Sequence, residues 1–296
     1  MPDTPLQAVA DVQGKWSTTA NRLKADYQQA RWLTFALSIA AALLAAVASQ
    51  VDGQPRAYLA ALSTVLFAGV TFLAARRLDA QRAAAWVRAR SAAEALKRAA
   101  YKFAVQASPY DDPASRDTRF NQEVDEIEQG VDDLLGQQVD GPAGSAPVAP
   151  LSPDEYAQQR VREQIAYFES NALALKAMAD RMRRAEFWLA LVTACITAIV
   201  GVAGKDLIGG LKFDFVALTA VLTTISGAIL AHIEASRYDF TVTAYRAAAR
   251  RLRDALRDMP AHPVPPSAEW SAFVDRIEGI LADENSSWVA KFGKPA

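Results

Sequence analysis

The residues of this chain that could do chemistry are scarce and badly spaced for catalysis. Two histidines and one cysteine occur, and Cys195 lies inside an uncharged run. His232 and Glu234 are two positions apart, so on a helix they point to different faces and do not form a chelating pair. GxSxG nucleophile elbows and the phosphate loops GxGxxG and GxxxxGKS/T do not occur. We therefore expect no enzymatic activity, no cofactor and no metal site.

Hydroxyl side chains are the polar groups that recur inside the uncharged runs. Thr193 and Thr197 share one helical face, as do Thr219 and Thr223, and Gly227 continues the second face as a small-xxx-small ridge. Such residues let helices pack closely, and they could also line a weakly selective water-filled pathway that closes by dewetting. Both uses stay open for the candidate pore-lining or helix-packing residues, which are Thr193, Thr197, Thr219, Thr223, Ser226 and Gly227.

Four uncharged runs must hold these residues, at about 32–49, 57–75, 187–204 and 215–233. A helix that crosses a hydrocarbon core about 30 Å thick, at about 1.5 Å per residue, needs roughly this length. The breaks within each pair are too short for a domain, so each pair must form a hairpin. A buried hairpin in a soluble protein is the alternative, but a soluble core seldom repeats such a pattern. We predict an all-α membrane protein of two tandem transmembrane hairpins with long cytoplasmic helices.

The two hairpins read as copies of one unit. Trp32 aligns with Trp188, and Arg77 aligns with Arg237, at an offset that drifts by only a few positions. Internal repetition of this kind indicates two copies of one supersecondary unit. We expect a first two-transmembrane unit at 1–140, a Gly/Pro-rich linker at 141–153 and a second two-transmembrane unit at 154–296.

Positive charges predict the orientation of the spans. Arginines and lysines cluster before and after each hairpin, whereas the two short breaks hold only Arg56, Lys205 and Lys212. By the positive-inside rule, both termini and the central segment are cytoplasmic. We expect the bacterial inner (plasma) membrane, with the lipid bilayer as the immediate surroundings of the spans.

Composition agrees with a membrane protein that has large water-exposed parts. The chain is 51% hydrophobic with a formal net charge of −1, and its mean hydropathy is only +0.02. A near-neutral charge argues against a nucleic-acid partner, for which a strongly basic domain is typical. The single cysteine excludes an internal disulfide.

The segments outside the spans are expected to be helical for the most part. Residues 1–13 are expected to be loose, 15–31 to form a helix that enters the first span, and 78–105 to continue the second span as one helix. Residues 120–135 form an acidic amphipathic pattern, typical of a helix packed on basic neighbours.

The last helix carries an apolar stripe with enough area to dock on another helix. Its residues recur at three-four spacing, and we expect them to pack on the chain's own cytoplasmic helices or on a neighbouring protomer. These candidate packing residues are Trp270, Phe273, Ile277 and Trp288.

Several short motifs resemble one bacterial family. They are Lys15-Trp16-Ser17 before the first hairpin, Ser91 to Lys97 after it, Ala235 to Tyr238 after the fourth span, and Glu284 to Trp288 near the C-terminus. With the hairpin layout, they resemble the SLATT group, the SMODS- and SLOG-associating two-transmembrane effector domains, in the form that carries two units in tandem. The resemblance implies a helical effector that forms pores in the inner membrane, downstream of a nucleotide sensor in defence or conflict systems. Because this chain has no sensor signature, the resemblance implies a separate nucleotide-sensing partner.

Two functions of different classes follow. The leading hypothesis is a homo-oligomeric pore-forming effector or channel-like module. The alternative is a non-conducting membrane scaffold whose cytoplasmic helices dock a partner protein. Small and hydroxyl-bearing residues favour both helix packing and pore lining, so the sequence leaves the choice open.

Overall fold

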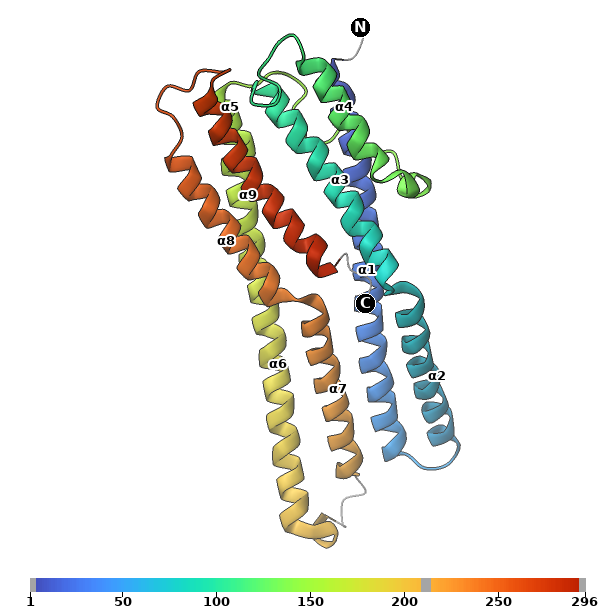
Figure 1. Ribbon diagram of the computed structural model, residues 1–296. Helices are drawn as coiled ribbons and strands as arrows, with labels where there is room; N and C mark the ends of the chain where they lie inside the picture. The colour runs from blue at the N-terminus through green and yellow to red at the C-terminus, as the bar shows by residue number, and fades with distance from the viewer. Residues whose placement is uncertain (1–3, 209–213, 293–296) are drawn as a thin grey trace. The chain divides into compact units, whose positions relative to one another are not determined.

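Helices form every regular element in the part of the chain that the structure describes. The computed structural model describes the backbone of residues 4–208 and 214–292, and the side chains of residues 4–202 and 214–286. The longer helices are α1 (Pro5–Gln50), α2 (Gln54–Arg77), α3 (Ala80–Ala104), α4 (Arg116–Gln129), α6 (Glu163–Ile208), α7 (Phe215–Ser236), α8 (Tyr238–Arg257) and α9 (Ala268–Phe292) (Figure 1). Short helical turns complete them: η1 (Asp132–Gln137), α5 (Pro153–Tyr156) and the π-helical η2 (Ala157–Arg162).

The helices divide into two compact units, and each unit takes segments from both halves of the sequence. Unit 1 comprises Met1–Asp26, Ala80–Leu173 and Val242–Ala296, and unit 2 comprises Tyr27–Asp79 and Ala174–Thr241. Both α1 and α6 therefore supply residues to both units. The division of the sequence into two repeats remains a prediction, because the compact units follow a different partition.

Unit 2 contains the apolar segments of four helices that are long and apolar enough to cross a membrane. Few residues of their most apolar windows are buried inside the protein, and none in the window of α6. Large side chains such as Tyr58, Phe72 and Ile199 are 72%, 65% and 61% exposed. Water would not tolerate such a surface, whereas lipid tails cover it without cost. The prediction of an all-α membrane protein is confirmed.

Hydrogen bonds and ring contacts join α1 to α2 and to α7 within unit 2. The Ser63 hydroxyl of α2 donates to the Ala41 carbonyl oxygen of α1, at 2.8 Å. The rings of Trp32 and Phe35 on α1 lie 4.4 Å and 4.8 Å from the His232 ring of α7. At the other end of these two helices, the Asp214 amide donates to Gln50 Oε1 at 2.8 Å. Because the middle of α1, at Trp32, lies beside the end of α7, and the end of α1, at Gln50, lies beside the start of α7, the two helices run antiparallel.

Two helices of unit 2 end at breaks that no glycine or proline marks, and one of these breaks differs from expectation. The structure ends α2 at Arg77 and begins α3 at Ala80, so the predicted single helix from the second span through 78–105 is wrong. The fourth span ends similarly at Ser236, because Arg237 takes the left-handed conformation with φ 49°. No glycine or proline marks either break. Asp79, a residue type that favours helix starts, was the only local signal.

The N-terminal segment also differs from its expectation. Within the described residues α1 already begins at Pro5, so residues 5–13 are helical and not loose. Leu6, Val9 and Ala10 are buried in unit 1. Proline is tolerated in the first turn of a helix, where its missing N–H has no partner to lose.

Unit 1 has a core of large apolar side chains, and its α3 packs most extensively on α9. Trp16, Phe168, Leu252 and Trp270 are among its fully buried side chains. A proper capping box at Ser152 and Glu155 starts the first turn of the second half.

The Gly/Pro-rich segment between the two halves lies tightly on α1. We call residues 137–146 the strap. The Gly144 amide donates to the Ala10 carbonyl oxygen at 2.9 Å, and the Val139 amide donates to Thr19 Oγ1 at 3.0 Å. A Cβ atom on Gly14 would lie only 2.3 Å from the Pro142 carbonyl oxygen, so glycine permits this close approach.

Candidate functional site

The hydroxyls predicted to line a pore or pack helices satisfy their hydrogen bonds within their own helices, with one exception. Thr193 donates to Leu189 O, and Thr197 donates to Thr193 O, at 2.7 Å and 2.8 Å. On α7, Thr223 donates to the carbonyl oxygen of Thr219 at 2.9 Å. Thr219 itself bonds the carbonyl oxygen of Val216 at 2.8 Å. Threonine in an apolar helix commonly bonds the preceding turn in this way, so these hydroxyls are satisfied without a partner on another helix.

Ser226 is the exception, because it reaches another helix. It is buried, and its hydroxyl lies 3.0 Å from Oε1 of Glu186 on α6. Glu186 is the residue before the third uncharged run, where the sequence analysis assigned it no role. Its carboxylate meets a serine from the middle of the neighbouring helix, which pins α6 to α7 inside unit 2. A carboxylate directly before a span was the available signal.

The exposed side of α7 carries mostly small and hydroxyl-bearing residues. Thr223 and Gly227 are exposed, whereas Val221 and Ile229 are buried against other helices of unit 2. The exposed arc is made of Val216, Ala220, Thr223, Thr224, Gly227, Leu230, Ala231, Glu234 and Ala235. Seven of these nine residues are small or polar, which is the reverse of the composition that a purely lipid-facing surface favours.

The candidate packing residues of the last helix lie in the interior of unit 1. Trp270 and Ile277 are fully buried and Phe273 is 6% exposed. The indole Nε1–H of Trp270 donates to the Val105 carbonyl oxygen at 3.0 Å. These contacts join α9 to the end of α3 within one chain. Trp288 belongs to α9 by its backbone, but its side chain lies outside the described residues.

A buried ion pair in the core of unit 1 was missed by sequence reasoning. Arg160 and Glu278 are each 2% exposed, and Nη2 of Arg160 lies 2.7 Å from Oε2 of Glu278. Arg160 Nε donates to the other carboxylate oxygen at 2.9 Å, so the pair is bidentate. The Tyr156 hydroxyl donates to the same oxygen at 3.0 Å. Arg160 belongs to the π-helical turn η2, a rare element that often marks functional positions.

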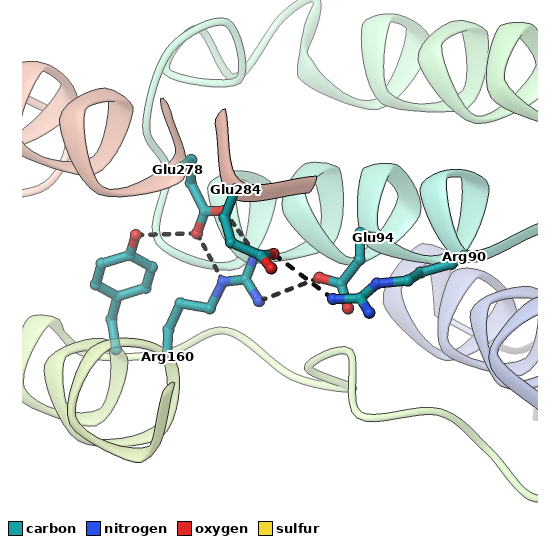
Figure 2. A network of polar contacts seen from close by, with 6 residues as sticks. Arg90, Glu94, Arg160, Glu278 and Glu284 are labelled. Carbon is teal, nitrogen blue, oxygen red and sulfur yellow. Dashed lines mark hydrogen bonds and ion pairs between the residues drawn. The ribbon is translucent and has the colours of Figure 1, made fainter. Parts of the chain in front are cut away.

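The ion pair extends into a larger network. Nη1 of Arg160 lies 4.0 Å from the Glu94 carboxylate, and Arg90 lies 3.5 Å from Glu284 (Figure 2). The guanidinium of Arg160 also stacks over the ring of Tyr101, 4.8 Å from its centroid. Helices α3, η2 and α9 therefore meet through charges inside unit 1.

Electrostatics keep the Arg160 guanidinium charged. Burial by itself would lower the pKa of Arg160, but the adjoining Glu278 carboxylate holds that pKa above its usual range. Burial and the same carboxylate raise the pKa of Tyr156, which stays a neutral donor. Among the described residues, no group of three or more His, Cys, Asp or Glu side chains is placed to hold a metal ion.

Comparison with known families divides the chain into two matched segments. Residues 156–288 match the family described as SMODS and SLOG-associating 2TM effector domain 1. Residues 14–118 match a different family, described as a protein of unknown function (DUF4231). No curated protein and no solved structure matches the chain. The segment at 156–288 thus matches a membrane effector module of the SLATT family, as the resemblance implied, over slightly less than half of the chain.

Proposed function

We propose that the chain is a pore-forming membrane effector whose copies assemble with the exposed face of α7 around a common pathway. The observation that carries this proposal is the exposed arc of α7, where Thr223 and Gly227 lie outside and the aliphatic Val221 and Ile229 lie inside. Lipid would solvate the larger residues better than the hydroxyls. A neighbouring copy or a water-filled lumen suits the small and hydroxyl-bearing face.

Other helices of unit 2 also expose small and hydroxyl-bearing residues, such as Thr64 on α2 and Thr197 on α6, but they expose more large apolar side chains than α7 does. On α2, Tyr58, Val65 and Phe72 are 72%, 64% and 65% exposed, and on α6 Trp188 and Ile199 are 60% and 61% exposed. These are large apolar side chains, with aromatic residues near the ends of the runs, as in membrane-interface belts. Within each copy, α2 and α6 are therefore assigned to lipid and α7 to the assembly.

The arc on α7 ends in a carboxylate. Glu234 is exposed and follows Gly227 by seven positions, which places it on the same side of the helix. In an assembly with α7 at the centre, these carboxylates would form a ring at one mouth of the pathway. Such rings concentrate cations, so the proposed pore prefers cations but discriminates weakly among them.

Orientation and context complete the proposal. We assign both termini to the cytoplasmic side of the bacterial inner membrane, because the basic residues Arg76, Arg77 and Arg237 end the returning spans. The matched family is described as SMODS- and SLOG-associating, which supports a separate partner protein that supplies the signal. A nucleotide-sensing partner in a defence system is the form that the family resemblance implies.

A second candidate function is the non-conducting scaffold. One observation favours it: the Thr223 and Thr224 hydroxyls already donate to carbonyl oxygens of their own helix, each at 2.9 Å. They need no water to satisfy them. In that case α7 would only pack against another membrane helix, and unit 1 would dock a partner.

Cysteine cross-linking tests the assembly. Gly227→Cys in a Cys195→Ala background should give disulfide-linked dimers in native membranes, because the same face of α7 meets its copy. The matched control is Phe72→Cys, which lies on the lipid-facing side of α2 and should remain monomeric. Equal cross-linking at both positions, or cross-linking only at Phe72, would place α7 away from the assembly axis.

A further inference from the structure

Unit 1 contains a pocket of about 240 Å³ whose charged lining is mostly cationic. Lys24 from α1 and Arg90 and Lys97 from α3 line it, and Glu94 is the one carboxylate among its described lining residues. Three positive groups thus share the pocket with a single negative one. All these residues belong to unit 1, so the pocket lies within one compact body.

The lysines of this pocket lack close carboxylate partners among the described residues. Arg90 pairs with Glu284 at 3.5 Å, outside the pocket lining. Neither Lys24 nor Lys97 has a carboxylate oxygen within 4.0 Å in the described part of the chain, although both are half-buried. Other described lysines, such as the half-buried Lys102 with Asp275 at 2.8 Å, do have such a partner.

The surroundings of the pocket disfavour the charged state of its two lysines. Burial lowers the pKa of Lys24, and the nearby Arg90 guanidinium lowers it further. Burial and Arg160 likewise lower the pKa of Lys97, against smaller opposing effects of the Glu94, Glu278 and Glu163 carboxylates. Half-buried cations in mutual repulsion cost folding free energy unless an anion joins them. An anion bound in the pocket would offset this cost and so stabilise the folded protein.

The remaining lining suits a ligand with more than one polar group. Asn21 and Gln164 contribute amides that donate and accept hydrogen bonds, and Trp86 and Tyr167 contribute aromatic walls. Arginine and lysine together are the usual partners of phosphate oxygens. A carboxylate with one charge would leave half of the net positive charge of the lining uncompensated. A phosphate monoester, with close to two negative charges at neutral pH, would match it.

We infer that this pocket is a binding site for a phosphate-bearing anion, held by Lys24, Arg90 and Lys97. The site is independent of conduction by unit 2 and goes beyond the proposed pore. Arg90 is shared between the pocket and Glu284 of α9, so a bound phosphate would compete with Glu284 for its guanidinium. A ligand in the pocket would thereby change the ion pairing of the charged network that joins α3, η2 and α9 (Figure 2).

Calorimetric titration of inorganic pyrophosphate into the full chain in nanodiscs of neutral lipid tests the site. Saturable binding is expected, weakened about ten- to a hundredfold by Lys24→Gln and by Lys97→Gln. Lys97→Arg, which keeps the charge, should retain binding. The matched control is Lys15→Gln, on the same helix as Lys24 but outside the lining and paired with Asp140 at 3.6 Å, which should leave the affinity unchanged.

A second arm separates a soluble phosphate from a lipid headgroup. If the natural source is soluble, pyrophosphate binds equally well to discs with and without phosphatidic acid. If the source is a headgroup, phosphatidic acid prevents pyrophosphate binding to the wild type and raises the melting temperature of the wild type. Both effects should be lost in Lys97→Gln. The inference is overturned if neither phosphate source binds. It is equally overturned if binding is the same in both Lys→Gln variants as in the wild type while their helical circular dichroism is native.

Discussion

Arg160 and Glu278 form a buried ion pair, and we expect the loss of one partner to cost far more stability than the replacement of both. Each is 2% exposed, so either charge left alone would be buried without compensation. Glu278→Gln should lower the free energy of unfolding of unit 1 by about 3–5 kcal/mol, because a buried guanidinium loses its counter-ion. Thermal melting followed by circular dichroism, with hydrogen exchange of unit 1 amides, measures the loss.

Two further variants show whether the charge itself is responsible. Asp283→Asn removes the exposed pair with Arg251, at 2.8 Å, and should change stability by at most about 0.5 kcal/mol. The double variant Arg160→Met with Glu278→Leu should recover most of the stability, because two apolar side chains replace a desolvated ion pair. A double variant as unstable as Glu278→Gln would contradict this account.

The two lysines of the phosphate pocket give a pH-dependent prediction. Their pKa values are lowered below the ordinary value of 10.5, so the folded state disfavours the charged form. The resulting destabilisation is complete below the folded-state pKa and shrinks as the pH rises toward 10.5, where the unfolded chain also loses the protons. Without phosphate, the Lys24→Gln/Lys97→Gln variant should therefore melt higher than the wild type at pH 7, and this difference should narrow by pH 10. A variant that melts lower at pH 7 would show the lysines to be stabilising.

The sequence contains a signal for only some of these buried charged residues. Trp270, Ile277 and Glu284 are spaced by seven, so Glu284 falls in line with an apolar stripe and could have been recognised as a buried carboxylate that needs a cation. Its ion-pair partner Arg90 and the Arg160–Glu278 pair were beyond prediction. Glu278 lies 118 positions from Arg160, and no local pattern connects positions so far apart.

At the scale of elements, periodicity predicted the helices and failed at their junctions. The stripe on α9 and the uncharged runs of α1, α2, α6 and α7 repeat over many residues, so their helical state followed from the sequence. The breaks between α2 and α3 and at Arg237 have no glycine or proline, and the tertiary structure determines them. The Gly/Pro-rich composition of residues 141–153 predicted a linker, but the close packing of the strap on α1 depends on contacts that sequence patterns do not report.

Glycine 14 tests the strap. In Gly14→Ala the new methyl group would meet Pro142 O at 2.3 Å and Gly144 N at 2.7 Å, both backbone atoms that cannot rotate away. Unit 1 should lose about 1–3 kcal/mol of stability as the strap is displaced. The matched control is Gly279→Ala, also in a helix of unit 1, where a Cβ meets nothing within 4 Å. That change should stabilise the protein by up to about 1 kcal/mol through helix propensity. Equal effects of the two substitutions on stability would contradict the claim that the packing of the strap against Gly14 stabilises unit 1.

At the scale of the whole molecule, the proposed orientation predicts which loops an impermeant thiol reagent reaches. Asp52 lies in the short loop before α2 and is exposed. It is a better position for a cysteine than the neighbouring Gly53, because the φ of Gly53, +77°, disfavours residues other than glycine. Asp52→Cys in a Cys195→Ala background should react in intact cells. Ser145→Cys, exposed on the strap, should react only after the membrane is permeabilised. Reaction of Ser145→Cys in intact cells would reverse the orientation.

Ion flux from liposomes that contain the purified protein tests the central claim most directly. The account predicts cation-preferring flux in the wild type, measured with and without pyrophosphate. Glu234→Gln should reduce the cation preference, and Thr223→Val should reduce the conductance, because the pathway loses a hydroxyl and dewets more easily. The matched control Thr71→Val, on α2, also loses a hydroxyl that bonds its own helix, at 3.2 Å, and should conduct like the wild type. Folded, inserted wild-type protein that passes no ions under either condition would contradict the pore and leave the scaffold as the function.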